Sequence, residues 1–215
     1  MILTTLLFAF ALIQQGTCTI GLDTIQAMSV DTFKCLLNKN FKFFIARVWI
    51  SIGDYDRVGI QNIKNARAAG IPYVDGYIFP CHRSGCAPAK NQVEATINRL
   101  RSDNAKFGMI WMDIERQDWP SNKQTNRQFI RDMVNQADRM GVKVGIYSNP
   151  VNWEAIVGLN WSEMSEYPLW WANYNGSPSF NGFKAFGGWT KPAIHQYLGD
   201  KQGPCDVKLD YNWYP

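Results

Sequence analysis

The sequence predicts an α/β fold, namely an irregular, single-domain, TIM-like β/α barrel with about eight strands and five main helices. As far as residue 157, short apolar runs rich in β-forming residues alternate with helical patterns, which is typical of parallel βα units. Beyond that point the rhythm fades, and loops rich in Gly, Pro and Ser join the remaining strands. No internal repeat, linker or low-complexity tract divides the chain. One barrel with regular units first and irregular connections last fits these observations.

The N-terminal segment 1–18 is typical of a signal peptide. Residues 2–13 are apolar and uncharged, a stretch too short to cross a bilayer but suited to a secretory h-region. Gly16 and Cys18 are small enough to flank a cleavage site. We therefore predict a mature barrel domain over 19–215, secreted to the extracellular space or into a lytic or digestive compartment, with no membrane association.

The first half of the mature chain contains three strand–helix pairs. Strands are expected over 19–23, 43–49 and 73–79. Helices are expected over 30–38, over 60–69 and from Pro88 onward. Gly70 stands where a helix C′ residue would, and Pro88 suits a first helical turn because its missing N–H would have no partner there.

The second half begins with an apolar run over 107–112 and a long amphipathic helix. Ser121 and Gln124 form a capping-box pattern, and an apolar stripe then continues to Gly141. A buried strand is expected over 142–147, followed by a short helix near 151–157. The last three strands are expected over 169–174, 193–198 and 207–213.

The cysteine count agrees with an oxidising compartment. Removing residues 1–18 leaves an even number, Cys35, Cys81, Cys86 and Cys205. Four cysteines allow three pairings, of which the short loop around Gly85 favours Cys81 with Cys86 and therefore Cys35 with Cys205. No second close Cys or His pair completes a zinc site, so we expect neither a metal nor another cofactor.

The charge pattern narrows the possible partners. The formal net charge is +4, and a mildly basic secreted protein tends to bind anionic polymers such as bacterial walls. No Lys/Arg run exceeds two residues, which argues against a nucleic-acid partner. We expect a monomer.

Two carboxyl groups, Asp113 and Glu115, follow the apolar run 107–112. Because strand side chains alternate, residues two apart point the same way. Two like charges on one face raise the proton affinity of one partner, so one group can stay protonated while its neighbour is ionised. Glycosidic bond cleavage requires one protonated and one ionised carboxyl group of this kind. The alternative for an isolated Asp-x-Glu is a solvated loop entrance.

Further polar and aromatic residues end other predicted strands. In β/α barrels such strand ends meet at one mouth. Aromatic rings there can stack on sugar rings while polar rims bind hydroxyl groups, although core filling is the alternative for any single ring. The residues expected to converge are Asp23, Tyr77, Asp113, Glu115, Tyr147, Trp171, Gln196 and Asp210.

Other catalytic chemistries find little support. His195 lies within an apolar strand pattern, where a hydrogen-bonded structural histidine is commoner than a catalyst. His82 lies in the short cysteine loop, and we expect it to be solvated. There is no G-x-S-x-G motif, and two histidines in unrelated contexts argue against a serine hydrolase.

Seven segments, in this order along the mature chain, together resemble the glycoside hydrolase family 25 lysozymes, most of all their secreted, cysteine-containing eukaryotic branch. They are Ile20–Asp23, Gly76–Tyr77, Trp111–Glu115, Gly145–Asn149, Leu169–Tyr174, His195–Tyr197 and Leu209–Asn212. The resemblance implies an irregular β/α barrel that hydrolyses the β-1,4 bond between N-acetylmuramic acid and N-acetylglucosamine in bacterial peptidoglycan. It implies a role in antibacterial defence or in the digestion of bacteria.

The resemblance also implies roles for individual residues. Glu115 matches the general acid that protonates the leaving oxygen. Asp113 would stay ionised and either orient the 2-acetamido group of the substrate or stabilise developing positive charge. Asp23 and Asp210 match the flanking acidic positions, whereas Tyr77, Tyr147, Trp171 and Gln196 match the wall that positions the sugar.

This chain departs from the family pattern at two places. The segment 47–51 lacks the Thr-Glu-Gly often found there in bacterial members, and His195 stands where many relatives carry Trp. Two other functions stay open: a lectin-like peptidoglycan-binding protein that has lost turnover, and a chitinase-type glycosidase. The chitinase alternative needs D-x-x-D-x-D-x-E, of which this chain has only D-x-E.

Overall fold

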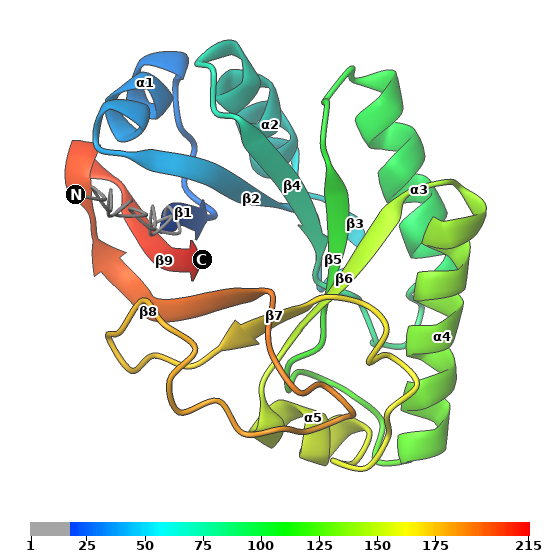
Figure 1. Cartoon of the computed structure of the whole chain (residues 1–215). Coiled ribbons are helices and arrows are strands. Elements are labelled where there is room, and N and C mark those ends of the chain that lie inside the picture. Colours follow the sequence, from blue (N-terminus) through cyan, green and yellow to red (C-terminus); the bar gives the residue numbers. More distant parts are fainter. Residues whose placement is uncertain (1–17) are drawn as a thin grey trace, which may run out of the picture.

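Eight strands close into a barrel in the computed structural model, which describes residues 18–215 (Figure 1). Around the barrel each strand pairs with the next, and the last pairs with the first. The strands are β1 (Thr19–Thr24), β2 (Phe41–Ile50), β4 (Tyr73–Ile78), β5 (Met109–Asp113), β6 (Lys143–Ser148), β7 (Leu169–Ala172), β8 (Ile194–Gln202) and β9 (Lys208–Tyr214). The short β3 (Asp54–Tyr55) pairs only with the end of β2. The predicted irregular barrel is confirmed.

All neighbouring barrel strands are parallel except at β9, which runs antiparallel to both β8 and β1. The chain enters β9 directly from β8 through a short 3-10 turn, η1 (Pro204–Asp206). Such a connection is too short for a parallel crossover, which needs a dozen or more residues. The barrel is therefore mixed, and its irregular half is the C-terminal one.

Five helices cover the regular half of the barrel, as expected. They are α1 (Val30–Asn38), α2 (Arg57–Ala68), α3 (Ala89–Ser102), α4 (Lys123–Arg139) and α5 (Pro150–Ile156). Figure 1 shows α1 to α4 ranged around the barrel from the upper left to the right, whereas the short α5 and long loops lie below β7 and β8. Among the described residues, no helix is long and apolar enough to span a membrane.

The start of α4 differs from the expected capping box. Asn122, one residue after Ser121, is the N-cap, and its side chain accepts hydrogen bonds from the N–H groups of Gln124 and Thr125. Asn and Ser are equally good N-caps, so the sequence pattern alone did not decide between neighbouring positions. Similarly, α2 starts at Arg57 behind the cap Asp56, three residues before the expected start.

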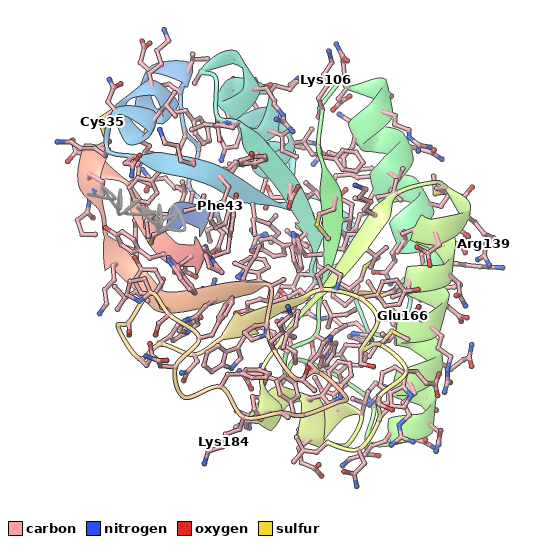
Figure 2. All side chains as sticks on the ribbon, in the orientation of Figure 1. Cys35, Phe43, Lys106, Arg139, Glu166 and Lys184 are labelled. Carbon is pink, nitrogen blue, oxygen red and sulfur yellow. A yellow bond between two sulfur atoms is a disulfide. The ribbon has the colours of Figure 1, made fainter. Side chains whose placement is uncertain are left out.

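Alternation along the strands separates two apolar layers. Outward-facing residues such as Phe44 and Ile110 pack beneath the helices. Inward-facing residues form a second layer inside the barrel, among them Phe43, Trp111 and Trp170. Figure 2 shows Phe43 within the ring of strands. The inner layer fills the interior of the barrel, and polar side chains occupy the end where the parallel strands finish.

Both predicted disulfides are present. Cys35 joins α1 to Cys205 in η1, and Cys81 joins Cys86 in the loop after β4. Cys18 is an exposed free thiol. The predicted signal peptide lies outside the described residues except for Cys18.

Candidate active site

A cavity of about 130 Å³ opens at the carboxyl ends of the parallel strands. Seven of the eight residues expected to converge line it: Asp23, Tyr77, Asp113, Glu115, Tyr147, Gln196 and Asp210. The two other lining residues are Trp170 and Tyr174, which the sequence analysis did not assign to the site. The structure therefore brings four carboxyl groups from three separate strand ends into one small space.

Strand register places the four carboxyl groups. Asp113 is the last residue of β5 and lies beside Tyr147 of β6. Glu115 follows two residues later and points into the same cavity, as alternation requires. Asp23 on β1 and Asp210 on β9 are direct partners across an antiparallel pair, so their side chains share one face.

The Gln196 side chain links two of these carboxyl groups to two tyrosines. Its Nε2 donates to Asp23 Oδ1 at 2.8 Å and to Asp210 Oδ2 at 3.2 Å. Its Oε1 accepts from the hydroxyl groups of Tyr147 at 2.8 Å and Tyr174 at 3.0 Å. All four hydrogen-bonding positions of the amide are used, so Gln196 is fixed and in turn fixes the groups around it.

The pKa of Asp113 is raised well above its ordinary value. Burial is the main cause, and the neighbouring charges of Glu115 and Asp23 add to it, whereas Arg47 opposes it. The Asp113 Oδ1 atom is buried and has no hydrogen-bond partner among the described residues. Burial therefore favours a proton on Asp113, whereas the family resemblance implied an ionised carboxylate.

The other three carboxyl groups are also perturbed upward. Burial raises the pKa of Glu115, with a further contribution from Asp210. Burial also raises the pKa of Asp23 and that of Asp210, and hydrogen bonds from Asn212 and Gln196 partly oppose the effect at Asp23. Four such groups cannot all ionise in one small cavity, so the cluster retains protons above the usual pH range of carboxyl groups.

The cavity lies between two wider hollows. One of about 670 Å³ shares Glu115, Tyr147 and Tyr174 with it. The other, of about 300 Å³, shares Asp23, Tyr77 and Asp210 with it. Together the three form a groove that crosses the mouth of the barrel. The hollow of about 670 Å³ is the largest of these three spaces, and Glu115 is the only carboxyl group among the described residues that lines both this hollow and the deep cavity.

Trp171 does not lie with the other predicted residues in the deep cavity. It borders the largest hollow, but its ring packs in the outer layer, stacked on His195 and edge-on to Phe183. Its neighbour Trp170 points inward instead and contacts Tyr77 and Tyr147 edge-on. Strict alternation on β7 explains this, because only one of two consecutive residues can face the barrel interior.

The expectation that His82 is solvated is wrong. Its ring packs on Trp119, with the centroids 3.6 Å apart, and on Phe129. Burial lowers the pKa of His82 to about 4. Trp119 precedes α4 and Phe129 lies on it, so the cysteine loop packs against this part of the chain, a tertiary contact that the composition of the loop does not predict.

A barrel whose mouth carries a groove, a cluster of proton-retaining carboxyl groups and several aromatic rings is the architecture of a carbohydrate-cleaving hydrolase. Comparison with known proteins agrees. The family model described as "Lysozyme-like protein 1" matches residues 14–197. "Lysozyme-like protein 5" of Caenorhabditis elegans is 47% identical over 195 residues, which is 91% of each chain. "Probable GH family 25 lysozyme 4" of Dictyostelium discoideum is 40% identical, over 91% of this chain and 90% of its own length.

Solved structures share the fold. A family GH25 lysozyme from Aspergillus fumigatus superimposes with a TM-score of 0.69 at 20% identity, covering 93% of this chain and 94% of that one. A muramidase from Trichobolus zukalii gives 0.70 at 20% identity, covering 92% and 93%. The chain belongs to the lysozymes of glycoside hydrolase family 25, and it is a glycoside hydrolase.

Proposed function

We propose that this protein is a secreted lysozyme that hydrolyses the β-1,4 bond between N-acetylmuramic acid and N-acetylglucosamine in bacterial peptidoglycan. Family membership supports the substrate class, because the relatives carry the name lysozyme and two of the similar solved structures are of enzymes named muramidases. The groove supports a polymeric substrate, since its two wide hollows flank a narrow acidic centre.

Glu115 is the proposed general acid, and its position is the observation that carries this assignment. It stands where the deep cavity joins the largest hollow of the groove, so a glycan that passes between the two spaces brings a linking oxygen to this carboxyl group. Burial raises the pKa of Glu115, which lets it hold a transferable proton in weakly acidic solution. Asp113, Asp23 and Asp210 line only smaller parts of the groove.

Asp113 is the proposed partner of Glu115. Its unpaired Oδ1 lies deep in the cavity, where an N–H of a bound 2-acetamido group would supply the missing hydrogen bond. Such a bond favours the ionised form and lowers the pKa that burial had raised. Binding of substrate would thus convert Asp113 to a carboxylate that orients the acetamido group or stabilises positive charge at the sugar.

The remaining residues of the cavity are proposed to hold the sugar. Gln196 and its two tyrosine partners present a fixed polar wall, and Tyr77 closes the opposite side. Asp23 and Asp210 offer acceptors for sugar hydroxyl groups. Trp171 contributes at the edge of the largest hollow and not in the centre.

Secretion is part of the proposal. Two disulfides agree with an oxidising compartment, and residues 1–18 have the composition of a signal peptide. We propose that the mature enzyme spans 19–215 and acts as a monomer, outside the cell or in a digestive compartment, in defence against bacteria or in their digestion.

Replacing Glu115 by Gln tests the assignment. The amide keeps the shape but removes the proton donor, so release of new reducing ends from purified peptidoglycan should fall at least about a thousandfold, while the far-UV spectrum stays unchanged and the thermal midpoint does not fall. The exposed Glu94 on α3 is the matched control, and its change to Gln should leave turnover intact. Identification of muramic acid at the new ends confirms the bond. A protein that binds peptidoglycan and releases no ends is the lectin-like alternative.

A further inference from the structure

His195 on β8 makes an unusual pair of hydrogen bonds. Its side chain is fully buried, and both ring nitrogens contact backbone carbonyl groups. Nδ1 lies 2.6 Å from the oxygen of Ser179, and Nε2 lies 2.8 Å from the oxygen of Asn173. One imidazole ring thus joins both ends of the segment 173–179.

Two carbonyl partners constrain the protonation of this ring. A carbonyl oxygen only accepts hydrogen bonds, and a neutral imidazole carries a single N–H. Both contacts can therefore be hydrogen bonds only when His195 is an imidazolium ion. In the neutral ring one nitrogen would direct its lone pair at an oxygen less than 3 Å away, which is a repulsive contact.

The rings beside His195 are aromatic, and no charged group among the described residues shifts its pKa. The ring stacks on Trp171 with a centroid distance of 4.3 Å, an arrangement that favours a cation. Tyr197 on the same strand contacts it, and the pKa of that tyrosine is raised to about 12 by burial, so it stays neutral. Across the sheet the neighbour is Trp213, which contacts the free thiol of Cys18. Only the two carbonyl groups raise the pKa of His195, and burial outweighs them, so its pKa lies below the ordinary value.

The segment that His195 holds forms one wall of the groove. Asn173 and Tyr174 line the largest hollow, and Tyr174 also reaches the deep cavity. The hydroxyl of Tyr174 donates to Gln196 Oε1, which belongs to the carboxyl network. Backbone bonds from Asn173 to Gln196 and from Gly176 to Tyr197 attach the start of the segment to β8.

The far end of the segment has fewer attachments. The contact of Ser179 with His195 and the packing of Phe180 on Trp213 are its links to the barrel that involve side chains. Residues 174–178 between the two ends are exposed. Loss of the hydrogen bond between Ser179 and His195 would therefore leave residues 174–179 with few other contacts to the barrel.

We propose that His195 is a positioning residue that, as an imidazolium ion, clamps the segment 173–179 and keeps Tyr174 in the groove. Deprotonation breaks one of the two hydrogen bonds and loosens this wall. The clamp is closed in acid and opens as the pH rises through the pKa of His195. The effect on turnover rests on the proposed function, whereas the clamp itself does not.

The clamp can be tested without any substrate. The chain has two histidines, so the ring nitrogens of His195 can be followed by NMR in a protein labelled with ¹⁵N-histidine, with His82→Phe providing the assignment. Both nitrogens of His195 should be protonated in acid, and one should lose its proton as the pH rises. Amide hydrogen exchange at Gly176 and Ser179 should accelerate over the same pH range. A neutral His195 ring throughout the range in which the segment is protected would overturn the proposal.

Turnover provides the second test. His195→Phe keeps an aromatic ring against Trp171 but removes both donors, so kcat/KM should fall roughly tenfold in acid, and the difference from the unmodified protein should shrink at higher pH, where the neutral ring keeps only one hydrogen bond. Because His195 acts through Tyr174, Tyr174→Phe should lower kcat/KM similarly, and the double variant should lose little more than either single one. Additive losses, or an unchanged pH profile in His195→Phe, would contradict the clamp.

Controls separate the possible failures. His82→Phe removes the only other histidine, which packs on α4 away from the groove, and should keep the acid-side activity. If the unmodified protein released no reducing ends while the NMR titration behaved as expected, the proposed function would fail and the clamp would stand. Full turnover with a permanently neutral His195 would overturn the clamp and leave the proposed function in place.

Discussion

The indole Nε1 of Trp170 donates to Oδ1 of Asn212 at 2.7 Å, deep inside the barrel. Because an indole N–H can only donate, this bond fixes the orientation of the Asn212 amide. The Nδ2 group must then point the other way, where it donates to Asp23 Oδ1 at 2.6 Å. An inward tryptophan on β7 thus orients an acidic residue on β1 through an intermediate on β9.

Replacing Asn212 by Leu should therefore cost stability as well as activity. The change leaves the Trp170 N–H without a partner and removes one of the donors to Asp23, so we expect the free energy of unfolding to fall by about 3 kcal/mol. Urea denaturation measures it. Asn91→Leu on the exposed surface of α3 is the matched control and should change the free energy by less than about 0.5 kcal/mol. Equal changes in the free energy of unfolding at both positions would show that the hydrogen bonds of Asn212 to Trp170 and Asp23 do not stabilise the fold.

The sequence alone was sufficient to predict most of this site, because it depends on two simple periodicities. Strand alternation predicted that Asp113 and Glu115 share a face, and the βα rhythm predicted that strand ends meet at one mouth. Both statements need only local patterns. The Cys35–Cys205 pairing also followed from counting, once the short Cys81–Cys86 loop was recognised.

What the sequence analysis missed depends on phase and on tertiary contact. On β7 two tryptophans are adjacent, and a shift of one residue decides that Trp170 and not Trp171 faces the interior. Tyr174 lies beyond the end of β7, where no periodicity applies, and only the network with Gln196 reveals its place. His82 is half-buried against a helix that begins 41 residues later, at Lys123.

Stability should depend on pH through the carboxyl cluster. A carboxyl group whose pKa is raised on folding stabilises the fold when protonated, so its contribution is complete below about pH 4 and is lost as the pH rises through the folded-state pKa. Asp113 is such a group, because burial and Glu115 raise its pKa. Asp113→Asn removes the titrating group and therefore this loss of stability.

Thermal unfolding of Asp113→Asn and of the unmodified protein, compared from about pH 4 to about pH 8, measures this effect. The difference in stability should grow in favour of the variant as the pH rises. Glu163→Gln is the control, because Arg131 lowers the pKa of Glu163 to about 2 and it stays ionised over the whole range. A constant difference for Asp113→Asn would mean that this group does not titrate differently in the folded protein.

The two disulfides should differ in their contributions. Cys35 and Cys205 are 170 residues apart in sequence, and Cys81 and Cys86 only 5. In the chain-entropy description the long closure is worth about 5 kcal/mol and the short one about 2 kcal/mol. Paired Cys→Ala variants compared by urea denaturation should show that order. The reverse order would assign the short bridge a role in native packing beside Trp119 and Phe129.

Arg47 is the cation that opposes the proton on Asp113, so its removal should shift activity along the pH axis. Its Nε donates to Asp56 Oδ2 at 2.7 Å, and its charge lowers the pKa of both Asp113 and Tyr77. Without that charge Asp113 keeps its proton to higher pH. If turnover requires an ionised Asp113, Arg47→Gln should lose severalfold in kcat/KM on the acid side of the pH profile and little on its alkaline side.

Arg57→Gln is the control for this shift. Arg57 lies ten residues after Arg47 and pairs with Asp54 at 3.3 Å, but 69% of its side chain is exposed. Its replacement should therefore leave the pH profile of kcat/KM unchanged. Helix α2 should survive in both variants, because Asp56 still accepts the N–H of Gly59 through Oδ1. If Arg47→Gln lowered kcat/KM by the same factor at every pH, the contribution of Arg47 would come from its packing and not from its charge. An acid-side loss that Asp113→Asn abolishes would tie the effect to that one carboxyl group.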